Sequence, residues 1–129
     1  MRILALVTCL ALVEYMWIGF LVGQARGRYG IKAPATSGNE VFERYFRVHQ
    51  NTLEQLVIFL PGLWVFGSFV SAAVAGALGL VFIAGRFVYL RSYVANPDQR
   101  GLGFLLTFAP NAVLVLGGLV GAALAWLRS

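Results

Sequence analysis

The segment around residues 42–55 combines charged, amide and apolar side chains in a pattern that could bind a polar ligand. Arg47, Asn51 and Glu54 stand at positions i, i+4 and i+7, so on a helix they share one face over two turns. A guanidinium suits a carboxylate, an amide suits a peptide group and a carboxylate suits an ammonium group. The alternative is that the three side chains only pair with one another at a membrane surface.

A second polar group lies where a later apolar segment ends. Arg86, Tyr89 and Tyr93 stand at positions i, i+3 and i+7, and Arg100 follows after the turn formers Asn96-Pro97-Asp98. Tyrosines and arginines in such places often contact lipid headgroups, which is the alternative reading. If both polar groups lie at the same end of one bundle, they could hold a dianionic or zwitterionic ligand between two helices.

The composition restricts the class of protein that carries these residues. The chain has 129 residues, of which 60% are hydrophobic and 12% charged, whereas about 25% of residues are charged in an ordinary soluble domain. So few polar side chains could not cover a soluble domain of this size. Disordered, nucleic-acid-binding and soluble-enzyme classes are therefore excluded, and a single all-α integral membrane domain over residues 1–129 is expected.

Four apolar segments are each close to the roughly 20 residues that cross a bilayer. They cover about residues 3–23, 52–70, 74–91 and 103–127. A polar stretch of about residues 24–50 follows the first segment, and its turn-rich centre cannot form a continuous helix. The pattern predicts an antiparallel four-helix bundle with a long first loop.

The basic residues predict an orientation for this bundle. Of ten Lys and Arg residues, eight fall in the first loop, at the end of the third segment or in the loop after it, and only Arg2 and Arg128 lie elsewhere. Because basic loops remain on the cytoplasmic side, we expect the first and third loops in the cytoplasm and both termini outside. Binding of an anionic ligand is the alternative explanation for the excess of positive charge.

Other polar residues inside the apolar segments carry weaker signals. Glu14 lies halfway along the first segment, so we expect it to face the bundle, with Asn111 of the fourth segment as its partner. His49 has no Cys, Asp or Glu at ligand spacing, and no nucleotide-binding motif is present, so no metal or nucleotide cofactor is expected. The single cysteine, Cys9, cannot form an intrachain disulfide.

The run from Phe42 to Glu54 resembles the hallmark of the membrane-associated proteins in eicosanoid and glutathione metabolism, the MAPEG family. The likeness extends to the run from Ala84 to Tyr93, to Arg100 and to the four-segment layout. This family contains microsomal glutathione transferases, a leukotriene synthase, a prostaglandin synthase and a non-enzymatic lipid-binding activator protein.

The resemblance implies a homotrimer that binds glutathione as co-substrate between neighbouring subunits. Small residues spaced four apart, such as Gly19 and Gly23, would permit the close helix contacts of such an assembly. Arg100 matches the arginine that stabilises the glutathione thiolate in the leukotriene synthase. The positions that match glutathione-binding residues of the family are Arg26, Arg47, His49, Asn51, Glu54, Tyr89 and Tyr93.

Two departures from the leukotriene synthase pattern are visible. Gly27 stands where that enzyme has a second arginine, and Gln55 replaces a tyrosine. Both favour a general glutathione transferase or peroxidase that acts on apolar electrophiles or lipid hydroperoxides held in a lipid-facing groove. The alternatives are a non-catalytic lipid-binding or scaffold member of the family and a small transporter subunit or unrelated four-helix membrane protein.

Overall fold

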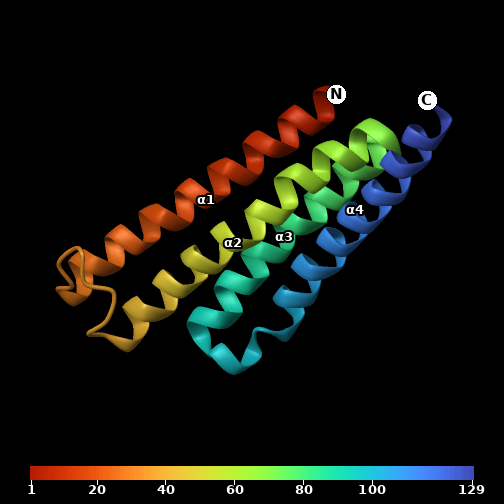
Figure 1. The fold of residues 1–129 in the computed structure, drawn as a ribbon. Helices are drawn as coiled ribbons and strands as arrows, with labels where there is room; N and C mark the ends of the chain where they lie inside the picture. The colour runs from red at the N-terminus through yellow and green to blue at the C-terminus, as the bar shows by residue number, and fades with distance from the viewer.

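The computed structural model describes residues 1–129, and all of its regular structure is helical. Four long helices run side by side, and the two chain termini lie at the same end (Figure 1). The helices are α1 (Arg2–Tyr29), α2 (Glu40–Phe69), α3 (Ala72–Ala95) and α4 (Gly101–Arg128), with a short 3-10 helix η1 (Pro97–Gln99) before α4. Each of the four is long and apolar enough to cross a membrane, which confirms the predicted all-α, four-helix class.

The helices are longer than the apolar segments, so the prediction that residues 24–50 form a loop is wrong at both ends. Only residues 30–39 connect α1 to α2. The side chain of Asn39 caps α2 by accepting hydrogen bonds from the backbone N–H groups of Val41 and Phe42. Glu40 and Glu43 lie in the first turn, where their negative charges interact favourably with the positive end of the helix dipole. Hydropathy marks the part of a helix that suits lipid, whereas caps determine where the helix starts.

This extension matters for the site, because it places the polar residues of the α2 N-terminal half on a rigid helix. Arg44 links the N-terminal half of α2 to the end of α3, because it donates hydrogen bonds to the carbonyl oxygens of Val94 (3.0 Å) and Ala95 (3.3 Å). Its guanidinium also pairs with Glu40 one turn earlier at 2.8 Å. The free carbonyls at the C-terminus of α3 are thereby partly satisfied.

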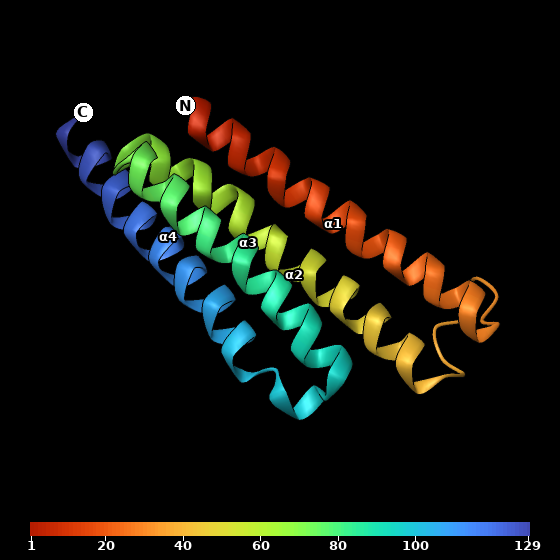
Figure 2. The same cartoon turned by 180° about the vertical axis from the view of Figure 1, so that it is seen from behind.

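The apolar core lies where α2 and α3 face each other, with α1 and α4 packed on opposite sides of this pair (Figures 1 and 2). Phe59 of α2 and Phe82 of α3 stack with ring centroids 3.9 Å apart, and Trp64 of α2 donates a hydrogen bond to Thr8 of α1. The buried residues of this core are Leu4, Val7, Ala11, Leu56, Phe59, Leu63, Phe66, Ala75, Phe82 and Leu114. The core therefore fixes the end of the bundle that carries the termini.

Large apolar side chains are exposed on the outer faces of all four helices. Examples are Met16 of α1, which is 72% exposed, and Leu116 of α4, which is 61% exposed. A surface of this kind on one chain suits lipid or further subunits and would be unfavourable in water.

Glu14 faces into the bundle with only 4% of its surface exposed, which confirms its predicted direction. The predicted partner is wrong. Asn111 of α4 donates its amide hydrogen bond to the side-chain oxygen of Gln55 on α2 at 3.2 Å, and no hydrogen bond reaches the Glu14 carboxylate. The reason is topological, because α1 and α4 lie on opposite sides of the α2–α3 pair.

Candidate polar binding site

A cavity of about 290 Å³ opens between α2, α3 and the start of α4, near the end of the bundle that carries η1. Its walls bring together every predicted site residue except Arg26 and His49. The lining residues are Arg47, Gln50, Asn51, Glu54, Tyr89, Tyr93 and Arg100. Two residue groups far apart in the sequence therefore form one polar cavity.

Helix α2 provides one wall of the cavity. Arg47, Asn51 and Glu54 project from the same face of this helix, as their spacing predicts, and Gln50 lies beside them. Sequence reasoning missed Gln50, although its position was readable. It stands three residues after Arg47 and four before Glu54, which places it on the same helical face.

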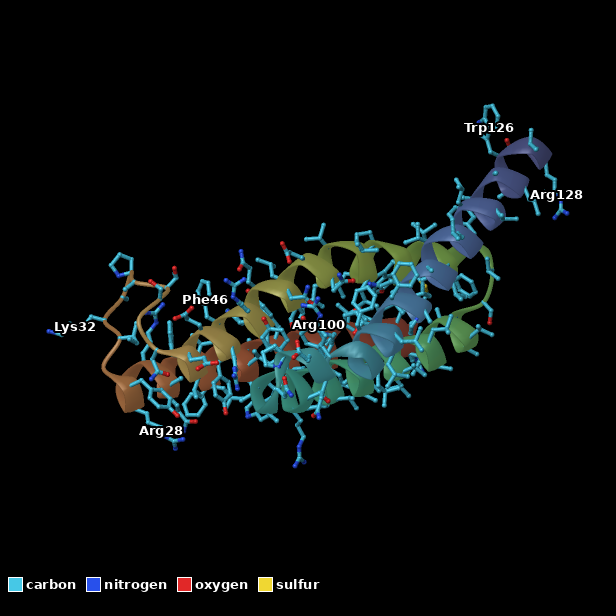
Figure 3. The ribbon with its side chains drawn as sticks, turned by 90° about the horizontal axis from the view of Figure 1, so that it is seen from below. Arg28, Lys32, Phe46, Arg100, Trp126 and Arg128 are labelled. Carbon is cyan, nitrogen blue, oxygen red and sulfur yellow. The ribbon has the colours of Figure 1, made fainter.

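Helix α3 and the start of α4 provide the opposite wall. The rings of Tyr89 and Tyr93 stack with centroids 5.6 Å apart. Arg100 immediately precedes α4, and Gly103 allows α4 to approach α3 very closely, since a Cβ atom at Gly103 would lie 2.5 Å from the Tyr89 Cα. Arg100 is exposed, and Figure 3 shows Lys32 extending away from the bundle at the loop of residues 30–39.

The charged side chains of the cavity have no ionic partners within the chain. The one ion pair in the structure joins Arg44 to Glu40, outside the cavity. The alternative that Arg47, Asn51 and Glu54 merely pair with one another is therefore not what the structure shows. Two guanidinium groups and one carboxylate face a common space, which gives the cavity a positive balance suited to a ligand with more acidic than basic groups.

Arg86 lies beneath this cavity and does not line it. It is fully buried, and its Nη2 donates hydrogen bonds to Asn51 Oδ1 and Thr52 Oγ1, both at 2.9 Å. Its Nη1 donates to Thr107 Oγ1 at 3.2 Å, and its guanidinium lies 4.4 Å from the Tyr89 ring centroid. The sequence grouped Arg86 with the tyrosines, but its contacts to α2 and α4 could not be read from spacing along α3.

Arg26 and His49 lie outside the cavity of their own chain. Arg26 donates a hydrogen bond to the carbonyl oxygen of Ala35 at 2.7 Å and covers the ring of Phe42. His49 stacks on Tyr15 of α1 with ring centroids 4.4 Å apart. At about 100° per residue, a position two residues after Arg47 points to the other side of α2, which is why His49 faces α1.

One further hollow adjoins the site, and another lies on the α1 side of the bundle. A polar cavity of about 410 Å³ shares Arg47 and Gln50 with the first and extends it toward Thr36 and Ser37 of the connecting loop. An apolar groove of about 470 Å³ is lined by residues of α1, α2 and α3, which include Trp17, Leu21, Tyr45, Leu90, Arg91 and Val94. The chain therefore has a polar cavity on the α4 side of the α2–α3 pair and a separate apolar groove on the α1 side.

The sequence matches the MAPEG family over residues 4–120, and the chain belongs to this family. With four helices of membrane-crossing length, it is a multi-pass membrane protein.

Three relatives place the chain within the family. It is 45% identical to an uncharacterized protein of Synechocystis sp. over 90% of this chain and 85% of the relative. Human microsomal glutathione S-transferase 2 is 37% identical over 97% of this chain and 85% of that protein. Leukotriene C4 synthase of Rattus norvegicus is 33% identical over 98% of this chain and 92% of that enzyme.

Proposed function

We propose that the protein is a membrane-bound glutathione transferase that joins glutathione to apolar electrophiles, with glutathione-dependent reduction of lipid hydroperoxides as a related activity. The observation that carries the proposal is the cavity in which Arg47, Arg100 and Glu54 stand without ionic partners. Glutathione has two carboxylates and one ammonium group, so its charges complement this set. The names of the transferase and synthase relatives support the same substrate.

In this proposal the α2 wall binds the tripeptide. Arg47 binds a carboxylate, Glu54 accepts hydrogen bonds from the ammonium group, and Asn51 contacts the peptide backbone. Tyr89 and Tyr93 line the opposite wall and confine the ligand between α2 and α3. Since these groups stand on helices, they are held in place before the ligand arrives.

Arg100 stabilises the glutathione thiolate in the proposed mechanism. A free thiol has a pKa near 8.5, and nearby cations lower it, with each pKa unit equal to about 1.4 kcal/mol of preference for the thiolate. Arginine provides this field without losing a proton itself. The thiolate sulfur then attacks the electrophilic carbon, a carbon–sulfur bond forms, and the leaving group departs with the bonding electron pair.

A hydroperoxide would react with the same thiolate. The sulfur attacks the terminal peroxide oxygen, the oxygen–oxygen bond breaks, and the alkoxide takes a proton to become an alcohol. A second glutathione reduces the resulting sulfenic acid to give glutathione disulfide and water. The apolar groove lined by α1, α2 and α3 lies on the other side of the α2–α3 pair from the polar cavity of the same chain, so it would hold a lipid-like substrate for the cavity of a neighbouring subunit.

The proposed assembly is a homotrimer with the polar cavity at a subunit boundary. The exposed apolar faces supply surface for such contacts, and Arg26 would reach glutathione from the neighbouring subunit. His49 is left out of the proposed site because it is stacked against Tyr15 of its own chain. In the membrane, the loop of residues 30–39 faces the cytoplasm and the termini lie on the opposite side, as the basic residues predict.

The deciding experiment is ultraviolet difference absorbance of the purified protein with and without glutathione, at neutral pH. A thiolate band is expected for the native protein, and the band should be lost in Arg100→Ala. Arg128→Ala is a matched control, because this exposed arginine lies at the far end of the bundle (Figure 3). Glutathione binding without a thiolate band would instead identify a non-catalytic member of the family.

A further inference from the structure

The hydrogen bonds of Arg86 determine which atoms of Asn51 remain free for a ligand. Asn51 belongs both to the cavity wall and to the network beneath it, because its Oδ1 accepts a hydrogen bond from Arg86 Nη2 at 2.9 Å. No other side-chain hydrogen bond of Asn51 is formed in the chain, so its Nδ2 group keeps both N–H donors. Asn51 therefore faces the cavity as a hydrogen-bond donor.

The network leaves Arg86 little freedom to move away from Asn51. Thr52 donates its hydroxyl proton to the Val48 carbonyl at 2.7 Å, and Thr107 donates its own to the Gly103 carbonyl at 3.0 Å. Both hydroxyl groups consequently present lone pairs to Arg86, which holds the guanidinium between α2 and α4. The Tyr89 ring covers one face of the same guanidinium.

The reversed orientation of the Asn51 amide is unfavourable for a simple electrostatic reason. It would direct the amide N–H groups at a guanidinium that can only donate. A buried arginine that loses a hydrogen-bond acceptor is poorly compensated in a low-dielectric surrounding. The charge of Arg86 thus selects one of the two amide orientations.

We propose that Arg86 is a positioning residue that fixes the Asn51 amide with its N–H groups toward the cavity. The part of glutathione that meets Asn51 is then a hydrogen-bond acceptor, a peptide carbonyl or a carboxylate, and not an amide N–H or the ammonium group. The identity of this ligand rests on the proposed function, whereas the donor role of Asn51 follows from the network.

The competing explanation is that Arg86 only holds α2, α3 and α4 together. A structural role predicts that replacing Arg86 weakens glutathione binding by the same factor whether or not Asn51 is present. A positioning role predicts that the effect depends on Asn51. A double-mutant cycle on the dissociation constant separates the two.

The cycle uses Arg86→Gln, Asn51→Ala and the double variant in the full-length protein purified in detergent. Calorimetric titration with glutathione gives the dissociation constant, and thermal unfolding reports stability. We expect Arg86→Gln to weaken binding about tenfold in the native background, the scale of one lost charge-assisted contact, and to have little effect once Asn51 is alanine. Trp64→Phe is the matched control, since it removes an interhelical hydrogen bond outside this network, that of Trp64 to Thr8, and should lower stability while leaving glutathione affinity unchanged.

Asn51→Asp keeps the inference testable even if Arg86→Gln does not fold. Aspartate still accepts from Arg86, so the fold should be retained, but it faces the cavity with an acceptor in place of a donor. We expect it to weaken glutathione binding more than Asn51→Ala does. Native-like affinity of Asn51→Asp, or an equal Arg86→Gln effect in both backgrounds, would overturn the positioning role alone, whereas a native protein that fails to bind glutathione would overturn the proposed function.

Discussion

Replacing Arg47 with alanine is expected to weaken glutathione binding while leaving the chemical step nearly unchanged. The guanidinium lines the cavity, is exposed to it and has no ionic partner in the chain, so its removal leaves no buried charge behind. A hydrogen bond to a charged group contributes about 1.5–3 kcal/mol. Because 1.4 kcal/mol corresponds to about a factor of ten, and solvent access favours the lower end of the range, the expected rise in KM for glutathione is about tenfold.

The assay is steady-state conjugation of glutathione to an apolar aryl halide, with glutathione varied at a saturating second substrate. A KM that rises while kcat is retained is the mark of a contact equally strong in the ground and transition states. Arg47→Lys should restore only part of the affinity if the native contact is a two-point one. An unchanged KM in Arg47→Ala, with Arg128→Ala as the charge-matched control, would refute the assignment of Arg47 to a carboxylate.

The remaining predictions concern the thiolate, helix packing, the buried carboxylate and assembly. Arg100→Ala should lower kcat and raise the pKa of the bound thiol, with partial rescue by Arg100→Lys; unchanged values in both measurements would make Arg100 a membrane-surface anchor and move the thiolate role to Arg26 or Arg28. Gly103→Ala should lower the free energy of unfolding by about 1–3 kcal/mol, because the added Cβ would meet the Tyr89 backbone. A lower melting temperature would show this loss, and an unaltered melting curve would contradict the close approach. Glu14→Gln should retain turnover, since this carboxylate does not line the cavity; abolished turnover in an intact assembly would give Glu14 a catalytic duty. Native mass spectrometry in detergent should show three chains, and only monomers or dimers would contradict the trimer.

The sequence predicted the architecture well because the bilayer imposes a length on each apolar segment. The third predicted segment, residues 74–91, lies within the observed α3, and Ser71, which separates α2 from α3, falls in the gap between the second and third predicted segments. Hydropathy could not locate the start of α2 at Glu40, since that boundary depends on the Asn39 cap and on polar helix turns outside the apolar segment. The largest error therefore lies where lipid no longer constrains the composition.

The two walls of the cavity were predictable for a similar reason, because periodicity along a helix defines its faces. What periodicity cannot supply is the identity of the neighbouring helix. The spacing of Arg86 suggested a place beside the tyrosines, yet its guanidinium reaches α2 and α4 beneath them. Likewise, spacing places His49 on a different face of α2 from Arg47, but only the packing of α1 on α2 shows that its neighbour is Tyr15.

The geometry also changes what the two departures from the leukotriene synthase pattern mean. Gln55 does not line the polar cavity; its side chain accepts a hydrogen bond from Asn111 and joins α2 to α4. Gly27 has open space around it, and an added Cβ atom would meet no neighbouring group in the chain. Neither position contacts the cavity of its own chain, so the glutathione-binding proposal does not depend on them. An effect of these positions on substrate choice would have to act through the α2–α4 contact or through a neighbouring subunit. Gln55→Tyr is therefore expected to alter the packing of α2 on α4, because it removes the hydrogen bond from Asn111, and to affect the reaction only through that packing.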